Sequence, residues 1–385
     1  MYADQASMLI HELHSTHASV RDNAAQTLAH LKIRKAAPAL IEAMGDTVYS
    51  VRSQAERALA NMLTQSDQPL LIKTMRSPNG YRRAGAAELL GIMGNSKAVP
   101  CLILALKDRQ SLVRERAVTA LGFIGDSSAV PPLISLLRDK NSRIRYQAVN
   151  ALGRLHSPQA AQSLIPLLHD RDSEVQSAAA MAIAHSGDRK AVPALIRMAL
   201  QPAGSDPFNS RYYAAYALGV LGDSRAAPVL LLALHASNRT LRAEAAAALG
   251  NLHDPNAVPG LISALKDSYT LTRFAAAQAL GNLHDKRAVP ALEHSLKDKD
   301  EDVREQSAKA LGHIGDRRAV PALMRAAFDD SDDAIPHASA LALGWIGDPR
   351  ALPALQKLLH YPDVSVRNAA EFAIQRIHSL HPHKK

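Results

Sequence analysis

Histidines are abundant in the sequence, at 17 of the 385 residues, and their ring nitrogens could bind metal ions. Three of them, His378, His381 and His383, lie close together near the C-terminus and could bind a metal ion through their ring nitrogens. The acidic stretch 329–333 has neither the glycine nor the final glutamate of a calcium-binding loop. We therefore expect only adventitious metal binding at the tail, a solvated acidic turn at 329–333, and no metal site or cofactor.

Residue patterns for covalent or phosphate chemistry are absent from the sequence. It contains no glycine-rich phosphate loop and no pairing of a nucleophile with a base. Its only cysteine, Cys101, cannot form an internal disulfide or a cysteine-based zinc site. The longest apolar run, Ala226–Leu234, has 9 residues and is too short to cross a bilayer, and the N-terminus lacks the pattern of a signal peptide. We predict no catalytic residues, no membrane partner and a cytoplasmic location.

An internal repeat organises the chain. Hydrophobic residues make up 47% of the sequence but aromatic residues only 4%, so alanine and leucine must supply most of the core. Proline recurs at a regular interval, with Gln162 in one of the proline places and two longer steps, from Pro193 to Pro228 and from Pro321 to Pro353. The recurring prolines are Pro38, Pro69, Pro100, Pro131, Pro193, Pro228, Pro259, Pro290, Pro321 and Pro353.

Each repeat predicts two helices. The first has apolar residues at helical spacing and a proline near its start, where a missing N–H costs little. The second, of the type VRxxAAxALGxIG, carries Val, Ala, Leu and Ile along one side, and we number its positions from the Val. Neither helix can bury its apolar face alone, so neighbouring repeats must stack around one continuous core.

The repeat PALxxALxDxxxxVRxxAAxALGxIGD resembles the HEAT repeat, in the form found in phycobilin lyases, and the resemblance covers nearly the whole chain. It implies an all-α fold, an α-solenoid superhelix of about twelve HEAT-like helical pairs, in which the second helices line the concave face. We expect a single array over residues 1–385, with a loop insertion near 201–210 and a C-terminal tail at 379–385. HEAT arrays serve scaffolds, adaptors, transport factors and a few enzymes, so the resemblance specifies the fold more than the function.

One enzyme family with this repeat is deoxyhypusine hydroxylase, whose two irons are held by His-Glu pairs repeated at equivalent places. Positions 3 and 4 of the second helices here, such as Glu115-Arg116 and Tyr146-Gln147, contain no His-Glu pair. The single pair His11-Glu12 lies on a first helix and has no mate in another repeat. We therefore do not expect that activity.

Two further positions of the second helix are nearly constant along the chain. Position 2 is arginine in ten repeats: Arg21, Arg52, Arg83, Arg114, Arg145, Arg211, Arg242, Arg273, Arg304 and Arg367. The family resemblance implies that these arginines bond to aspartates between repeats, although a ladder of this kind could also bind phosphates. Position 10 is glycine in eight repeats, and a glycine inside a helix costs about 1 kcal/mol relative to alanine. We expect a close approach between helices to offset that cost.

Positions 3, 7 and 11 of each second helix form one exposed stripe, because they are four residues apart. The 36 stripe positions hold 7 of the 15 aromatic residues, where even scatter would place about one or two. Aromatic and arginine side chains are the usual anchors of an interface. We predict a partner-binding groove formed by Phe123, Tyr146, Arg154, His185, Tyr212, Tyr216, Phe274, His313, His337 and Trp345.

Charge on the stripe bears on the kind of partner. The stripe carries four basic and four acidic residues, so the net charge of +9 is not concentrated there, and nucleic acid is disfavoured as a partner. We predict a non-catalytic protein–protein interaction scaffold or adaptor that binds a protein partner in its groove. Two alternatives stay open: a phycobilin-lyase-like enzyme acting on a tetrapyrrole-carrying protein, and nucleic-acid binding through a basic outer surface.

Overall fold

The computed structural model describes residues 2–201, 210–328 and 334–381, and all regular structure in these ranges is helical. The acidic turn predicted at 329–333 and most of the predicted loop insertion near 201–210 lie outside the described residues. No described helix is both long and apolar enough to cross a membrane. The chain divides into two compact units, residues 1–188 and 189–385, which we call the N-terminal and C-terminal units.

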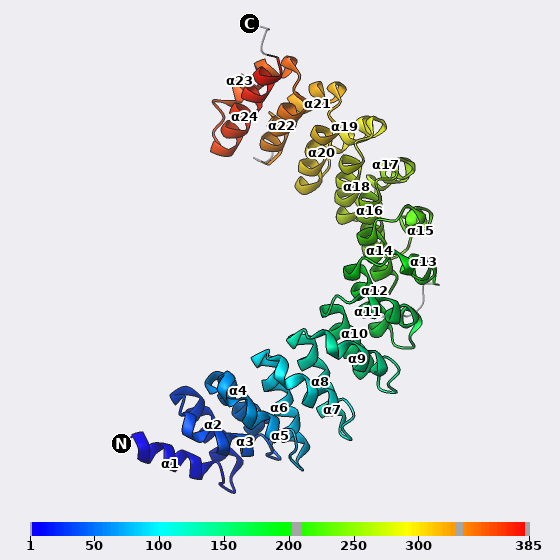
Figure 1. The fold of residues 1–385 in the computed structure, drawn as a ribbon. Helices are drawn as coiled ribbons and strands as arrows, with labels where there is room; N and C mark the ends of the chain where they lie inside the picture. Colours follow the sequence, from blue (N-terminus) through cyan, green and yellow to red (C-terminus); the bar gives the residue numbers. More distant parts are fainter. Residues whose placement is uncertain (1, 202–209, 329–333, 382–385) are drawn as a thin grey trace. The chain divides into compact units, whose positions relative to one another are not determined.

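In the N-terminal unit, six first helices alternate with six second helices along the chain (Figure 1). The first helices are α1 (Tyr2–Glu12), α3 (Ala37–Ala43), α5 (Gln68–Thr74), α7 (Val99–Ala105), α9 (Val130–Leu136) and α11 (Pro158–Leu164). The second helices are α2 (Ala18–Leu31), α4 (Tyr49–Met62), α6 (Gly80–Met93), α8 (Ser111–Ile124), α10 (Ser142–Arg154) and α12 (Ser173–Ser186).

The C-terminal unit has the same arrangement, with six helices of each kind. Its first helices are α13 (Val192–Ala199), α15 (Ala227–Ala233), α17 (Val258–Ala264), α19 (Val289–Ser295), α21 (Val320–Ala326) and α23 (Leu352–Leu358). Its second helices are α14 (Ser210–Leu221), α16 (Arg239–Leu252), α18 (Thr270–Leu283), α20 (Glu301–Ile314), α22 (Ala334–Ile346) and α24 (Val364–Leu380). Helix α24 therefore continues into the segment that the sequence suggested as a tail. The described residues confirm twelve helical pairs and an all-α fold.

Short 3₁₀ helices lead into most of the first helices. They are η1 (Arg34–Ala36), η2 (Gln65–Asp67), η3 (Ser96–Ala98), η4 (Ser127–Ala129), η6 (Arg189–Ala191), η7 (Ser224–Ala226), η8 (Pro255–Ala257), η9 (Lys286–Ala288), η10 (Arg317–Ala319) and η11 (Pro349–Ala351). The recurring proline then occupies the first or second position of the α-helix, as predicted. Several second helices end on a left-handed residue, which is glycine at Gly125 (φ 76°) but histidine at His253 (φ 52°) and His284 (φ 51°).

The repeat with Gln162 departs from this pattern. Its first helix, α11, begins at Pro158 without a preceding 3₁₀ helix and ends at Leu164, where the 3₁₀ helix η5 (Ile165–His169) begins. Pro166 explains the break, because proline inside an α-helix removes a backbone donor and clashes with the preceding turn.

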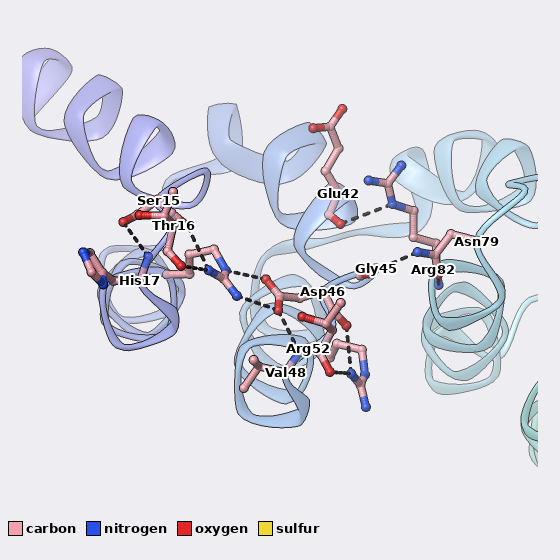
Figure 2. A network of polar contacts seen from close by, with 12 residues as sticks. Ser15, Thr16, His17, Glu42, Gly45, Asp46, Val48, Arg52, Asn79 and Arg82 are labelled. Atoms are coloured by element: carbon pink, nitrogen blue, oxygen red, sulfur yellow. Dashed lines mark hydrogen bonds and ion pairs between the residues drawn. The ribbon is translucent and has the colours of Figure 1, made fainter.

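Arginine at position 2 links consecutive repeats, as the family resemblance implied. Five of these arginines bond an aspartate in the turn of the next repeat, with N···O distances of 2.6–2.8 Å: Arg21, Arg83, Arg145, Arg242 and Arg273. Arg21 also donates from Nη1 to the carbonyl oxygens of Ser15 and Thr16, two residues that Figure 2 labels together with Asp46. The linking role is confirmed for these five arginines.

Arg52 shows what happens where the aspartate is missing. The equivalent place in the next repeat holds Ser77, and Arg52 donates instead to the carbonyl oxygens of Asp46 and Thr47 in the turn before its own helix (Figure 2). The contact within the repeat is kept while the carboxylate contact to the next repeat is lost.

The pair Arg242 and Asp267 has side chains that are only 15% and 12% exposed. The hydrogen bond from Arg242 lowers the pKa of Asp267, against the opposing effect of burial. The same bond raises the pKa of Arg242. Both groups are thus held in their charged forms in the folded chain.

Replacing Asp267 with asparagine should lower the free energy of unfolding by about 2 kcal/mol at pH 7, because a largely buried guanidinium would lose its carboxylate. Since folding lowers the pKa of Asp267, this advantage of the wild type is complete above a pH of about 4 and disappears as the pH falls through the folded-state pKa. Urea unfolding followed by circular dichroism at several pH values measures it.

The exposed Asp302, in the first turn of α20, provides the control, and Asp302→Asn should change stability by less than about 0.5 kcal/mol. A loss for Asp267→Asn that is equally large at pH 7 and pH 3 would contradict the role given to the carboxylate.

Glycine at position 10 lies directly against an alanine of the next second helix. A Cβ atom built on seven of these glycines would lie 2.7–3.0 Å from the Cα of that alanine: Gly91, Gly122, Gly219, Gly250, Gly281, Gly312 and Gly344. Non-bonded carbons prefer about 3.5–4.0 Å, so only glycine fits. The predicted close approach between helices is confirmed.

We expect Gly250→Ala to destabilise the chain by about 1–3 kcal/mol, because the new methyl group would push α16 and α18 apart. Helix propensity alone would change stability by about 1 kcal/mol in the opposite direction. The matched control is Gly260→Ala on α17, whose new methyl group meets only side-chain carbons of Leu231 and Leu234. Thermal unfolding compares the two, and a Gly250→Ala variant as stable as the wild type would show that the contact is not tight.

Candidate functional site

The stripe at positions 3, 7 and 11 reaches the surface in the structure, with exposed or half-buried side chains at all but two positions. All 36 stripe residues lie in the described ranges, and only Ala84 and Ser177 are buried. Within each unit, consecutive second helices pack side by side in one layer (Figure 1). Their stripes therefore lie next to one another on a surface that we call the second-helix face.

None of the ten residues predicted for partner binding is buried. Four are exposed (Phe123, Arg154, His185 and His313) and six are half-buried (Tyr146, Tyr212, Tyr216, Phe274, His337 and Trp345). The structure brings most of them together in three separate groups, one in the N-terminal unit and two in the C-terminal unit.

The first group surrounds a cavity of about 580 Å³ between α10 and α12. Tyr146 and Arg154 reach it from α10, and His185 reaches it from α12. The other residues that line it are Asn150, Gly153, His156, Ala178, Met181 and Ala182. A predicted aromatic residue, a predicted arginine and a predicted histidine thus share one pocket.

Arg154 is held in place by an aromatic ring. Its guanidinium carbon lies 4.3 Å from the centroid of the Phe123 ring, on the preceding second helix. A cation over a ring face within about 6 Å is attracted to it. Because Phe123 is 58% exposed, this pair forms part of the surface that a partner would meet.

Asn150 and Met181 belong to this pocket but were missed as site residues. Both occupy position 7 of their helices, and Met181 is 39% exposed. The signal that could have found them is their position, since position 7 lies between positions 3 and 11 on the same stripe.

The second group is a tyrosine cluster on α14. The rings of Tyr212 and Tyr213 meet edge to face, with centroids 5.2 Å apart. Burial raises the pKa of Tyr212 to about 12, and the nearby Glu244 carboxylate adds to the rise. Burial also raises the pKa of Glu244, while its hydrogen bond with Tyr212 acts in the opposite direction. Tyr212 therefore remains a hydrogen-bond donor to Glu244 and is partly structural.

The third group is the stack of His313 on Trp345, whose ring centroids lie 4.9 Å apart at an interplanar angle of 31°. Although His313 is exposed overall, partial burial of its ring lowers its pKa, and the neighbouring His284 adds to the effect. The His284 ring also lies 2.7 Å from the carbonyl oxygen of His313 through Nδ1. Phe274 and His337 make no ring stack with another of these residues in the described part of the chain.

Basic residues line the 3₁₀ edge of the C-terminal unit, where a phosphate track could lie. Four arginines there pair with the aspartate two positions earlier, and each also donates to a carbonyl oxygen of the preceding repeat: Arg225, Arg287, Arg318 and Arg350. Their charges are compensated by aspartates, so these four arginines connect repeats and are poorly suited to neutralise phosphates.

Metal ligands do not gather in the described part of the chain, where no group of three or more His, Cys, Asp or Glu residues could hold an ion. His381 from the predicted histidine tail is engaged instead with the backbone, its Nε2 lying 3.0 Å from the carbonyl oxygen of Gly347. His383 lies outside the described residues.

Comparison with known protein families agrees with this geometry. A family model described as HEAT repeats matches residues 6–91, 68–142, 99–178, 161–238, 228–307 and 295–375. The chain belongs to the HEAT-repeat family. The position-2 arginines, the position-10 glycines and the recurring prolines are therefore features of HEAT repeats in this chain.

Solved structures with a similar fold include those of importin beta, Kap95p and Kap121p. Importin beta is 17% identical, with 97% of this chain and 61% of importin beta covered and a TM-score of 0.65. Kap95p is 12% identical over 98% of this chain and 62% of its own, with a TM-score of 0.63. The karyopherin Kap121p is 13% identical over 97% of this chain and 49% of its own, with a TM-score of 0.58.

This HEAT-repeat chain thus spans between about half and three fifths of the length of these proteins. At such identities the likeness shows the α-solenoid fold alone. A comparison with curated proteins gave no match.

Trp345 is the only tryptophan of the chain and reports on the third group. Its fluorescence should fall as the stacked His313 becomes protonated, with a midpoint below about 6.5 because burial lowers the pKa of His313. A pH titration of the emission measures the midpoint. His313→Gln should remove this transition and His337→Gln should leave it, whereas a transition that survives His313→Gln would contradict the stacking.

Proposed function

We propose that this HEAT-repeat chain is a non-catalytic scaffold that binds a segment of a protein partner on its second-helix face. The observation that carries the proposal is the exposure of apolar side chains along the stripe. Five of them are 39–62% exposed: Ile92, Phe123, Met181, Val220 and Phe372. Exposed apolar and aromatic groups gathered on one surface typically mark an interaction site, because a partner that covers them removes apolar area from water.

Proteins of similar fold supply further support. Kap121p is described as bound to the extreme C-terminus of the protein phosphatase Cdc14p and, in another structure, to Ste12p. Kap95p is described as binding RanGDP. These are protein partners, and the proposal extends that class of partner to the present chain.

Charges on the stripe also suit a protein partner. Glu88 is paired with Arg116 at 2.5 Å, and Glu305 is paired with Lys309 at 2.6 Å. The stripe therefore offers short-range polar contacts without the basic track that nucleic acid requires. Together with the compensated arginines of the 3₁₀ edge, this pairing makes nucleic-acid binding the weaker proposal.

Two broader features belong to the same proposal. We treat the six repeats of each unit as parts of one array, supported by the HEAT match over residues 161–238, which crosses the boundary between the units. A cytoplasmic location is also proposed, and a chain with a single cysteine is consistent with it.

The phycobilin-lyase alternative rests on the sequence of the repeats alone. A lyase of this type would act on a tetrapyrrole-carrying protein. Purified chain that neither changes bilin absorbance nor binds a phycobiliprotein subunit would remove this alternative.

Removing exposed stripe side chains should weaken partner binding by about tenfold or more, because buried aromatic and apolar anchors dominate interface energies. The test variant is Phe123→Ala with Met181→Ala. Its control is Leu104→Ala with Leu232→Ala, which removes side chains that are 75% and 65% exposed on first helices. Affinity capture from a lysate of the source organism with quantitative mass spectrometry identifies the partner, and titration with that partner measures the affinity.

Both double variants must first show the circular dichroism spectrum of the wild type. Partners that are retained by the stripe variant and lost by the first-helix variant would place the interaction on the opposite face and contradict the proposal.

A further inference from the structure

The cavity between α10 and α12 combines hydrogen-bond donors with apolar groups and lacks any carboxylate. Arg154, Asn150, Tyr146 and two histidines provide the polar part of its lining. Met181, Ala178 and Ala182 provide the apolar part. None of the lining residues is Asp or Glu, so the charge that a ligand meets there is positive or neutral.

The guanidinium of Arg154 is available to a ligand. Within the described residues its only recorded interaction is the one with the face of the Phe123 ring. The carboxylate on the stripe of the preceding helix, Glu115, pairs with Arg143 at 3.3 Å. Stacking leaves the edge of a guanidinium free, and that edge matches the two oxygens of a carboxylate.

The cavity lies where the glycine–alanine contact between two second helices is looser than at the other position-10 glycines. A Cβ built on Gly153 would lie 3.7 Å from the Cα of Ala182, against 2.7–3.0 Å at the seven other position-10 glycines. Gly153 is also half-buried while those seven are buried. The looser contact joins α10 to the repeat whose first helix is interrupted at Pro166, between α11 and η5.

The size of the cavity bears on its occupant. About 580 Å³ lies within the range of about 300–1,000 Å³ that is typical of ligand sites. A carboxylate alone would leave the apolar part of the lining uncovered. An acidic residue beside an apolar one would satisfy both parts.

We propose that this cavity binds the side-chain carboxylate of an Asp or Glu residue in the partner segment, held by Arg154, with a neighbouring apolar residue of the segment against Met181 and Ala178. This inference rests on the proposed segment-binding function and names the chemistry that one part of the second-helix face recognises.

The probe is a phage-displayed library of random twelve-residue peptides, selected on the full chain. Enriched peptides should share an acidic residue next to an apolar one. A synthetic peptide from this set should bind Arg154→Gln about tenfold to hundredfold more weakly than the wild type, as expected when a charged hydrogen bond is lost. Replacing the acidic residue of the peptide by its amide should cause a similar loss in the wild type and little further loss in Arg154→Gln, because both changes remove the same contact.

The matched control is Arg171→Gln, which removes an equal charge from the exposed turn before α12 and should bind the peptide like the wild type. Equal binding by Arg154→Gln and wild type would overturn the inference. The inference would also be overturned if affinity fell when the C-terminal carboxylate of the peptide was amidated and did not fall when the acidic side chain was replaced by its amide. The cavity would then bind the chain end of the peptide.

The outcome for the proposed function is separate. The selected peptides could lack an acidic residue and still bind the double variant Phe123→Ala with Met181→Ala more weakly than the wild type. That result would support the scaffold function and overturn the carboxylate site. Failure to enrich any peptide over bare support, or enrichment of peptides indifferent to the stripe variant, would contradict segment binding on this face and the cavity's role with it.

Discussion

The close contact between glycine and alanine on consecutive second helices is the constraint on which the rest of the structure depends. It allows the helix backbones to approach so closely that seven glycine positions have no room for a Cβ atom. The contact holds the second helices in one layer, and that layer places the stripes of neighbouring repeats side by side. Arginine–aspartate bonds act across some of the same junctions at the helix starts, as Arg242 does with Asp267 between α16 and α18, where Gly250 meets Ala279. Where the glycine contact loosens, at Gly153, a cavity opens.

Much of this could be predicted from the sequence, because each feature is carried by a local and repeated residue type. Recurring proline marks the start of the first helix, position-10 glycine marks the tight junction, and an aspartate in the turn of the next repeat marks a possible link to arginine. Even the missing link at Arg52 can be predicted from Ser77. The exposure of the stripe could be predicted from helical periodicity. That prediction is wrong only at Ala84 and Ser177, where small side chains are covered by their neighbours.

The grouping of the candidate residues could not be predicted in the same way. The glycine–alanine contact beside the cavity between α10 and α12 differs from the other such contacts by about 1 Å or less in the Cβ–Cα distance, and periodicity does not resolve such differences. Whether a ring is a free anchor or a structural group depends on its neighbours in three dimensions. Tyr212 is bonded to Glu244 and Trp345 is stacked on His313, whereas Phe123 and Arg154 form a pair on the surface. Of the three groups, the one around the cavity offers the most accessible donors and apolar groups.

Site-specific crosslinking tests most directly whether the second-helix face is the surface that meets a partner. A photoreactive benzophenone amino acid would replace Phe123 on α8 in one sample and Leu104 on α7 in another, since both side chains are highly exposed, at 58% and 75%. After irradiation in a lysate of the source organism, we expect discrete adducts with a protein partner from position 123 and none from position 104. Adducts that form only from position 104 would contradict it.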